Sequence, residues 1–182
     1  MSCSRYPELQ TAWLVLTAWD AQVAAHGEHV ARELMRLAPA DEQEVWQWAG
    51  RLHDLGKITL PATILYKRGS LTRRERRTMQ EHSLRGAALL KQLHAPPIVI
   101  DGAKFHHERW DSTGYPFDIG QEQIPLVARV LAVADVYCTL TNDRPYRHAV
   151  SPNLARAEIE RNAGTQFDPG LVKIFFAHHN DE

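Results

Sequence analysis

This sequence of 182 residues has few cysteines and no long apolar run, and both features limit what the protein can be. Cys3 and Cys138 are its only cysteines, too few for a disulfide framework. We therefore expect free thiols in a reducing, cytoplasmic compartment. The longest apolar stretch, around residues 12–19, is too short to cross a bilayer, and nothing before it resembles a signal peptide. We expect no membrane span.

An excess of positive charge is also missing. Lysine and arginine total 21 and aspartate and glutamate total 22, so the formal net charge is −1 with neutral histidines. Proteins that bind nucleic acid polymers usually carry a basic excess, so we expect no such polymer as a partner. Repeats of about 20–50 residues are absent, which excludes solenoids. The length suits one domain with a real core, and we expect a single domain over residues 1–182.

Most of the chain has helical periodicity and little of the alternation typical of strands, so we predict an all-α bundle of about seven or eight helices. One helix is expected from Asp41, as its N-cap, to about Leu55, where Gly56 would end it. A capping-box pattern at the start of residues 72–93 predicts one helix over that segment. Glycines and prolines in residues 109–124 predict a loop or a small hairpin.

Asp135 is the first indication of chemistry. It lies in a predicted helix, residues 125–140, that is apolar on nearly every side, and the only other charge there is Arg129, six residues away. Helix positions six apart are not neighbours, and an unpaired buried carboxylate costs several kcal/mol. Two interpretations stay open. Asp135 is either a structural residue bound to the backbone or to a distant arginine, or a metal ligand whose charge a divalent cation stabilises.

Histidine is the one abnormally frequent residue, with ten copies. Taken singly, each histidine is explained at least as well by a core or surface role as by chemistry. Together with two carboxylates, however, they form a candidate set. The set is His26, His53, Asp54, His82, His106, His107 and Asp135. Such a set exceeds the roughly four ligands of one zinc ion and suits two metals bridged by a carboxylate. Without a thiolate, iron or manganese fits at least as well as zinc.

Three segments resemble one known family. Residues 53–57, His-Asp-Leu-Gly-Lys, resemble the HDxGK motif of HD-superfamily phosphohydrolases. Residues 106–116, HHERWDSTGYP, are similar to the HHExxDGxGYP segment that names the HD-GYP subfamily. Residues 135–147 resemble the VADVFDALTSxRPYR stretch of that subfamily, and the similarity extends over residues 26–176. The chain is therefore identified as a member of the HD-GYP family.

The resemblance implies a bacterial phosphodiesterase that hydrolyses cyclic di-GMP through a hydroxide held by two divalent metals. Iron or manganese is expected first, with zinc and nickel as alternatives. The candidate set above would supply the metal ligands, with Asp54 as the bridging carboxylate. Lys57 would contact the scissile phosphate or the bridging hydroxide, so Asp54 and Lys57 are the expected catalytic residues. The substrate-binding candidates are Arg144, Arg147, Lys67 and Tyr115. A guanidinium suits phosphate oxygens, whereas Tyr115 is expected to stack on a guanine, contact a partner or brace its turn.

Two positions depart from the family pattern. Ser112 stands where GxGYP has its first glycine, so either the loop is stiffer there or the position needs no positive φ. Gln22, one turn before His26, replaces a glutamate that binds a third iron in some members. A neutral amide is a poorer ligand, so we expect two metals, with pGpG rather than GMP as the product.

Two alternatives stay open. In one, the chain is a catalytically weak signalling module that binds cyclic di-GMP or a GGDEF-domain protein through the Tyr115 loop and the Arg144 face. In the other, it is an HD hydrolase of a different cyclic dinucleotide or mononucleotide. A fused or associated sensor domain is a further expected partner.

Overall fold

The computed structural model describes residues 5–143 and 148–179. Within these ranges the regular structure is entirely helical, apart from an isolated bridge between Ala163 and Phe167, which confirms the predicted fold class. The elements in chain order are α1 (Pro7–Trp19), α2 (Ala21–Leu37), α3 (Gln43–Leu52), η1 (Leu55–Thr59), α4 (Ala62–Leu65), α5 (Arg73–Gln80), α6 (His82–Gln92), α7 (Pro97–Phe105), η2 (Gln121–Gln123), α8 (Leu126–Thr141), α9 (Pro152–Arg161) and α10 (Pro169–Ala177).

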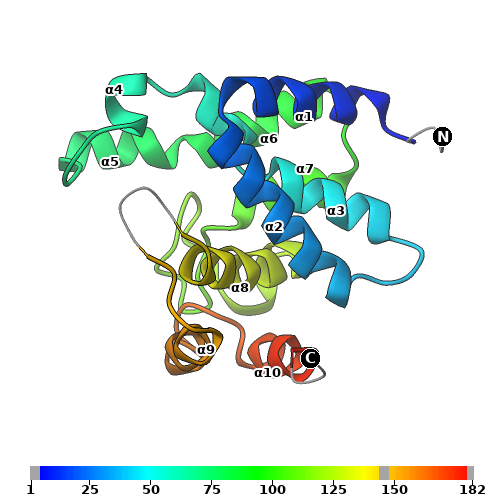
Figure 1. Cartoon of the computed structure of the whole chain (residues 1–182), viewed down its shortest axis with the longest axis vertical. Helices are drawn as coiled ribbons and strands as arrows, with labels where there is room; N and C mark the ends of the chain where they lie inside the picture. The colour runs from blue at the N-terminus through cyan, green and yellow to red at the C-terminus, as the bar shows by residue number, and fades with distance from the viewer. Residues whose placement is uncertain (1–4, 144–147, 180–182) are drawn as a thin grey trace.

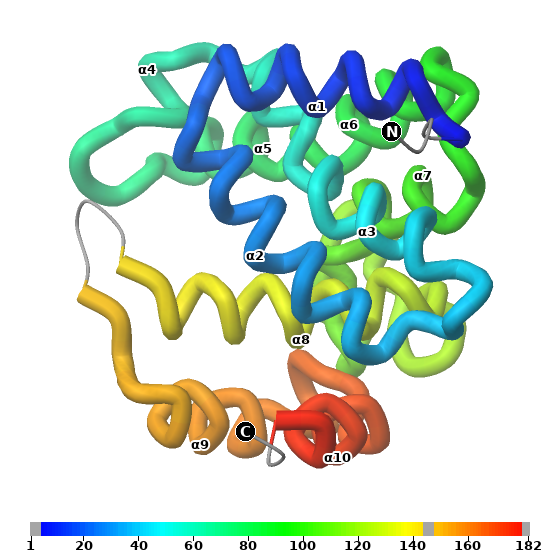
Figure 2. The backbone as a smooth tube through the Cα atoms, turned by 45° about the vertical axis from the view of Figure 1, so that its right-hand side comes forward, coloured from blue at the N-terminus to red at the C-terminus, as the bar shows by residue number. Residues whose placement is uncertain are grey.

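The helices lie in two groups that α2 connects. Figure 1 shows α1, α4, α5 and α6 at one end of the molecule, with α9 and α10 at the other end. In Figure 2, α2 runs from the end of α1 toward α8, which lies directly against the α9 and α10 layer. None of the helices in the described ranges combines the length and the apolar character that a membrane span needs.

Two apolar cores stabilise this arrangement. In the first, Leu16 of α1 packs with Leu52 of α3 and Leu90 of α6, and all three are fully buried. In the second, Leu131 of α8 packs with Phe175 of α10 and with residues of α2 and α9. Helix α8 is therefore covered on several sides, which explains its nearly continuous apolar sequence. Each such side chain contributes about 1.5–3 kcal/mol through burial.

The helix before the His-Asp pair differs from its prediction at both ends. Asp41 is not the N-cap, because α3 begins after Glu42 and has no side-chain cap. The helix ends at Leu52 rather than near residue 55, and Gly56 lies inside η1. A Cβ added to Gly56 would lie only 1.9 Å from the carbonyl oxygen of His82. The glycine thus lets η1 contact the backbone of α6, and it does not end α3.

The segment predicted as one helix over residues 72–93 is divided at Glu81 into α5 and α6. Its capping box is confirmed: the Thr72 hydroxyl accepts from the Glu75 N–H, and the Glu75 carboxylate accepts from the Thr72 N–H at 2.8 Å. The Glu81 N–H donates to the carbonyl three residues earlier, at 3.2 Å, which interrupts the α-helical pattern. His82 is consequently the first residue of α6, and its predicted position in the middle of a helix is wrong.

Residues 109–124 form a loop that ends in η2, with no strand among them. Ser112 has a φ of +61°, so this position does adopt the left-handed conformation although it lacks glycine. Gly114 is required for a different reason. A Cβ there would lie 2.5 Å from both the Arg109 nitrogen and the Glu108 Cα. The loop is therefore folded tightly back onto the residues that follow α7.

Candidate metal centre

The structure brings all seven candidate ligands together from segments that are far apart in the chain. Three groups of side chains each have potential ligand atoms within 4.8 Å of one another. The groups are His82, His106 and His107; His26, His53 and Asp135; and His53, Asp54 and His106. Because His53 and His106 each belong to two groups, the three groups make one cluster. It lies where α2, α8, the ends of α3 and α7, and the start of α6 meet.

The backbone orients three of the imidazoles. In each, Nδ1 contacts the carbonyl oxygen three residues earlier, at 2.7 Å in His53, 2.7 Å in His82 and 2.9 Å in His106. A carbonyl oxygen can only accept, so Nδ1 carries the hydrogen and Nε2 keeps a free lone pair. Metal-binding histidines usually show this arrangement, in which the second nitrogen donates to a carbonyl or carboxylate. All three rings are thus prepared to coordinate through Nε2.

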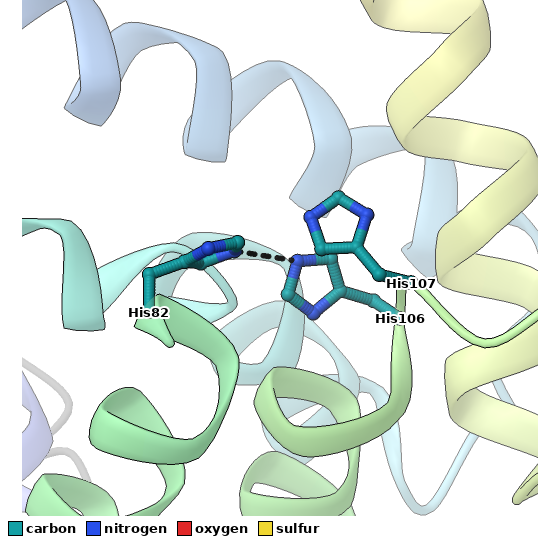
Figure 3. A group of neighbouring side chains, drawn as sticks. All are labelled: His82, His106 and His107. Atoms are coloured by element: carbon teal, nitrogen blue, oxygen red, sulfur yellow. Dashed lines mark hydrogen bonds between the residues drawn. The ribbon is translucent and has the colours of Figure 1, made fainter. Parts of the chain in front are cut away.

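Two of these lone pairs lie close to each other. His82 Nε2 and His106 Nε2 lie 3.3 Å apart, as Figure 3 shows together with the adjacent His107. Both Nδ1 atoms already hold the ring hydrogens, so neither neutral ring can donate to the other. Two facing lone pairs repel at this distance unless a cation lies close to both. The pair therefore has the geometry of two ligands to one positive ion.

His53 provides a second indication of a cation. The residue is only 1% exposed, and its Nε2 makes no hydrogen bond in the described part of the protein. Asp54 Oδ2 lies 3.3 Å from this nitrogen. An unpaired buried polar atom costs about 1–3 kcal/mol, and coordination of a metal would remove that cost. Nitrogen and carboxylate donors without a thiolate suit divalent iron, manganese or zinc. The residues present fit a metal site.

Asp54 lies between the imidazoles and is only 3% exposed. Its Oδ1 is 3.4 Å from His82 Nε2 and 3.9 Å from His106 Nε2, while Oδ2 faces His53 and accepts a hydrogen bond from the Lys57 ammonium. Burial alone would raise the pKa of Asp54, but Lys57 and the adjacent histidines outweigh it and hold the pKa well below its usual range. The two oxygens of an ionised carboxylate thus face different imidazoles, which is the arrangement of a bridging ligand.

Among the described residues, Asp135 is paired with a histidine and not with an arginine. Its Oδ1 lies 2.8 Å from His26 Nε2, and Thr139 Oγ1 donates to the same oxygen at 3.3 Å. Burial would raise the pKa of Asp135, but the hydrogen bond to His26 and the nearby His53 outweigh it and lower the pKa far below its usual range. Arg129, the arginine of the same helix, instead donates to Asp168 at 2.7 Å. Within residues 5–143 and 148–179, the geometry therefore does not support the alternative of a carboxylate bound to an arginine.

Burial favours the neutral form in three of the histidines, His82, His106 and His107, and the neutral form is the one that binds metals. Burial lowers the pKa of His106 well below its usual range and the pKa of His107 to about 3. Burial also lowers the pKa of His82. Near neutral pH these three rings carry no proton that a metal would have to displace.

A cavity of about 270 Å³ lies beside the cluster. Its lining combines residues of the cluster and of α8 with the loop after α7. The lining residues are His106, His107, Glu108, Arg109, Thr113, Gly114, Tyr115, Ala132, Asp135, Val136 and Gln166. The Tyr115 ring stacks on the His107 ring, with centroids 4.6 Å apart and 26° between the planes. Of the expected substrate-binding residues, Tyr115 lies in the cavity wall.

The other expected substrate-binding residues lie elsewhere. Lys67, between α4 and α5, is not part of the cavity lining, and its ammonium contacts the two carboxylate oxygens of Glu75 at 2.8 and 2.6 Å. Its role in binding substrate stays a prediction. Arg144 and Arg147 lie outside the described residues. Gln22, which replaces the glutamate of some family members, is exposed on α2.

Four polar cavity residues were not assigned a role from the sequence: Glu108, Arg109, Thr113 and Gln166. Arg109 and Thr113 stand at the variable positions of the HHExxDGxGYP pattern, so their place inside the motif was the available signal. Gln166 comes from the connection between α9 and α10. Only the tertiary structure brings that connection to the cavity, because its neighbours in sequence suggest no chemistry.

Comparison with known proteins agrees with this geometry. A family model described as HD domain matches residues 9–171. A cyclic di-GMP phosphodiesterase of Pseudomonas aeruginosa is 46% identical over 132 residues, which cover 70% of this chain and 31% of that protein. The 3'3'-cGAMP-specific phosphodiesterase 2 of Vibrio cholerae is 32% identical over 171 residues, which cover 90% of this chain and 33% of that protein. The chain thus spans about a third of the length of these relatives.

Among solved structures, an HDG"Y"P protein from Bdellovibrio bacteriovorus has the same fold. The TM-score is 0.67 at 16% identity, over 87% of this chain and 51% of that chain. The matched family model begins at residue 9, well before the first candidate ligand His26. Helix α1 is therefore part of the matched region, although the sequence resemblance was placed only over residues 26–176.

Proposed function

Because the chain belongs to the HD domain family, we propose that it is a metal-dependent phosphodiesterase that hydrolyses cyclic di-GMP. The observation that carries this proposal is the approach of His82 Nε2 and His106 Nε2 to 3.3 Å beside the ionised Asp54. That arrangement suits a cation, and a cavity of about 270 Å³ beside it gives room for a ligand. The name of the Pseudomonas aeruginosa relative supports cyclic di-GMP as the substrate.

In this proposal the whole cluster binds two divalent ions, iron or manganese before zinc, with Asp54 as the bridging ligand. The ligands are His26, His53, Asp54, His82, His106, His107 and Asp135. When bound, two such ions supply Lewis-acid stabilisation of the phosphate and lower the pKa of water. The absence of a thiolate from the cluster supports iron or manganese.

The protein's own residues would position the substrate for in-line attack by water. The Lys57 side chain is 25% exposed and has three N–H donors, of which Asp54 accepts one, so the ammonium can also donate to a phosphate oxygen. Its positive charge would stabilise the charge that develops as the phosphate reacts. The Tyr115 ring covers one face of His107 and would exclude bulk water from that side. The proposal also includes Arg144 and Arg147, which would bind phosphate oxygens of the substrate.

The expected product is pGpG. Gln22 replaces the glutamate that holds a third iron in some family members, and its side chain is exposed and uncharged. Chromatography of the products tests this point directly. Efficient conversion to GMP would contradict it.

A second substrate is favoured by one specific observation. The Vibrio cholerae relative that covers 90% of this chain is named a 3'3'-cGAMP-specific phosphodiesterase, and the same cluster could cut either cyclic dinucleotide. The proposal also includes a cytoplasmic location, which the small number of cysteines supports, and GGDEF-domain proteins or a sensor domain as partners.

Metal analysis combined with a turnover assay tests the proposal. The protein is loaded with iron or manganese under reducing conditions and offered cyclic di-GMP, 3'3'-cGAMP, cyclic di-AMP and cyclic mononucleotides. We expect two metal ions per chain and hydrolysis of cyclic di-GMP, both lost in Asp54→Ala. Binding of cyclic di-GMP without turnover by the metal-replete protein would instead identify a signalling module.

A further inference from the structure

We propose that Arg109 binds a pair of hydrogen-bond acceptors on the cyclic dinucleotide, in the cavity beside His107 and Tyr115. Two parts of the ligand offer such a pair: the O6/N7 edge of a guanine, and the oxygens of the phosphate that is not cut. This inference rests on the proposed function. It gives a substrate-binding role to Arg109, which stands at a variable position of the HHExxDGxGYP pattern.

Neighbouring side chains hold the Arg109 guanidinium in one orientation. Arg109 Nε donates to Asp111 Oδ1 at 3.2 Å and to Thr113 Oγ1 at 2.9 Å, while Nη2 donates to Asp111 Oδ2 at 3.0 Å. Thr113 Oγ1 in turn donates to Asp111 Oδ1 at 2.6 Å. Because a guanidinium is planar, two bonds to one carboxylate fix the direction of the whole group.

The backbone that carries this group is fixed as well. The Trp110 N–H donates to the Gln166 carbonyl at 3.2 Å, and the Asp111 N–H donates to the Thr165 carbonyl at 2.9 Å. These bonds join the loop after α7 to the connection between α9 and α10. The side chain is therefore oriented before any ligand arrives, which lowers the entropic cost of binding.

One edge of the guanidinium remains available. A guanidinium has five N–H donors, and the bonds to Asp111 and Thr113 use Nε and one hydrogen of Nη2. Across residues 5–143 and 148–179, no acceptor is seen for Nη1 of Arg109. The side chain is 30% exposed and forms part of the cavity wall. The Nη1 and Nη2 hydrogens form a second fork, which matches two acceptors side by side.

The ligand chemistry follows from this fork. Guanine presents two acceptors, O6 and N7, on one edge, whereas adenine presents the N6 donor beside N7. A fork of donors therefore discriminates between the two bases. A phosphate also presents paired acceptors, but it is identical in every cyclic dinucleotide, so the two sources predict different substrate dependence.

The experiment compares wild type, Arg109→Ala and Arg109→Lys, with Arg77→Ala as a matched loss of one positive charge from the exposed face of α5. The kcat and KM are measured with cyclic di-GMP, 3'3'-cGAMP and cyclic di-AMP, together with metal content and equilibrium binding of cyclic di-GMP. We expect Arg109→Ala to raise KM and Kd for cyclic di-GMP about tenfold or more with metal content unchanged. Lysine should not restore affinity, because an ammonium lacks the fork.

A loss that is largest for cyclic di-GMP and smallest for cyclic di-AMP identifies the guanine edge, and an equal loss for all three identifies the phosphate. Unchanged KM and Kd in Arg109→Ala would overturn the inference and leave the proposed function intact. So would a fall in kcat and metal content at constant KM, since Arg109 would then only brace the loop. If wild type binds but does not hydrolyse the ligand, weaker binding by Arg109→Ala still supports the inference while the proposed activity fails.

Discussion

His26 Nε2 and Asp135 Oδ1 lie 2.8 Å apart, although 109 residues separate them in the chain. This contact joins α2 directly to α8, so the two helix groups meet at the candidate metal centre. Ligand geometry and helix packing are consequently coupled. A change at the cluster should affect metal binding first, and a change in the packing around it should affect both metal binding and stability.

Asp135→Asn tests the coordination role of this carboxylate. Asparagine has the same size but no charge, so we expect the variant to keep its helical circular dichroism and to bind metal at least about tenfold more weakly. Metal content after dialysis, measured by elemental analysis, checks the prediction. Asp101→Asn, on α7 and outside the cluster, is the matched control and should retain the wild-type content. Full metal content in Asp135→Asn would show that Asp135 is not a ligand.

Gly56→Ala tests the close contact between η1 and α6. The new Cβ would lie 1.9 Å from the His82 carbonyl oxygen and 2.6 Å from the Gly86 nitrogen, so the backbone has to move. We expect a loss of about 1–3 kcal/mol in the free energy of unfolding, and weaker metal binding because His82 moves with α6. Denaturant unfolding measures the first effect and dialysis the second.

Gly170→Ala provides the comparison for that variant. Its nearest atom, the side-chain Oδ1 of Asp168, would lie 3.2 Å from the added Cβ, so a small adjustment of one side chain is enough. We expect a destabilisation clearly smaller than that of Gly56→Ala. Equal stability losses in the two variants would rule out the η1–α6 contact as a special constraint.

Ser112 is tested in two directions. Its φ of +61° is unfavourable for a residue with a side chain, so Ser112→Gly should raise the free energy of unfolding by up to about 1 kcal/mol. Ser112→Val should lower it by about 1–2 kcal/mol, because a β-branched residue fits this conformation worse. Thermal unfolding of the two variants checks both signs. A destabilised glycine variant would mean that the serine side chain contributes more than its backbone strain costs.

The metal-free protein should lose stability as the pH falls from about 6.5 toward 5. Burial lowers the pKa of His107 to about 3 in the folded state, while in the unfolded chain its pKa is near 6.5, the ordinary value for histidine. Between these values the unfolded state binds more protons, so stability is complete above pH 6.5 and decreases by about 1.4 kcal/mol per pH unit for this residue alone. His82 and His106, whose pKa values burial also lowers, act in the same direction.

Unfolding by denaturant at pH 7, 6 and 5, in the presence of a chelator, measures this slope. His107→Gln removes one titrating group and should give a shallower slope than wild type. An identical slope in the variant would show that His107 is already protonated in the folded protein. Added metal should raise the free energy of unfolding at neutral pH, since the metal binds the folded state.

Local signals were sufficient for much of this protein. The apolar periodicity, the Thr72–Glu75 capping box and the apolar helix around Asp135 each depend on residues within one or two turns, and the structure contains all of them. The seven candidate ligands could be selected from the sequence because a metal site explains two features together. These are the high number of histidines and the presence of carboxylates in apolar segments. For the same reason the helical class and the likeness to HD-GYP proteins were readable from residue order alone.

Long-range packing decided the rest. The break at Glu81 places His82 at the start of α6, and Gly56 serves the contact between η1 and α6, which no local pattern specifies. The 3.3 Å approach of two Nε2 atoms depends on segments that are distant in the sequence. So does the backbone beside Arg109, which the carbonyls of Thr165 and Gln166 hold. The amino-acid sequence determines which chemical groups are available. The distances between those groups are set only when the apolar faces of separate helices pack together.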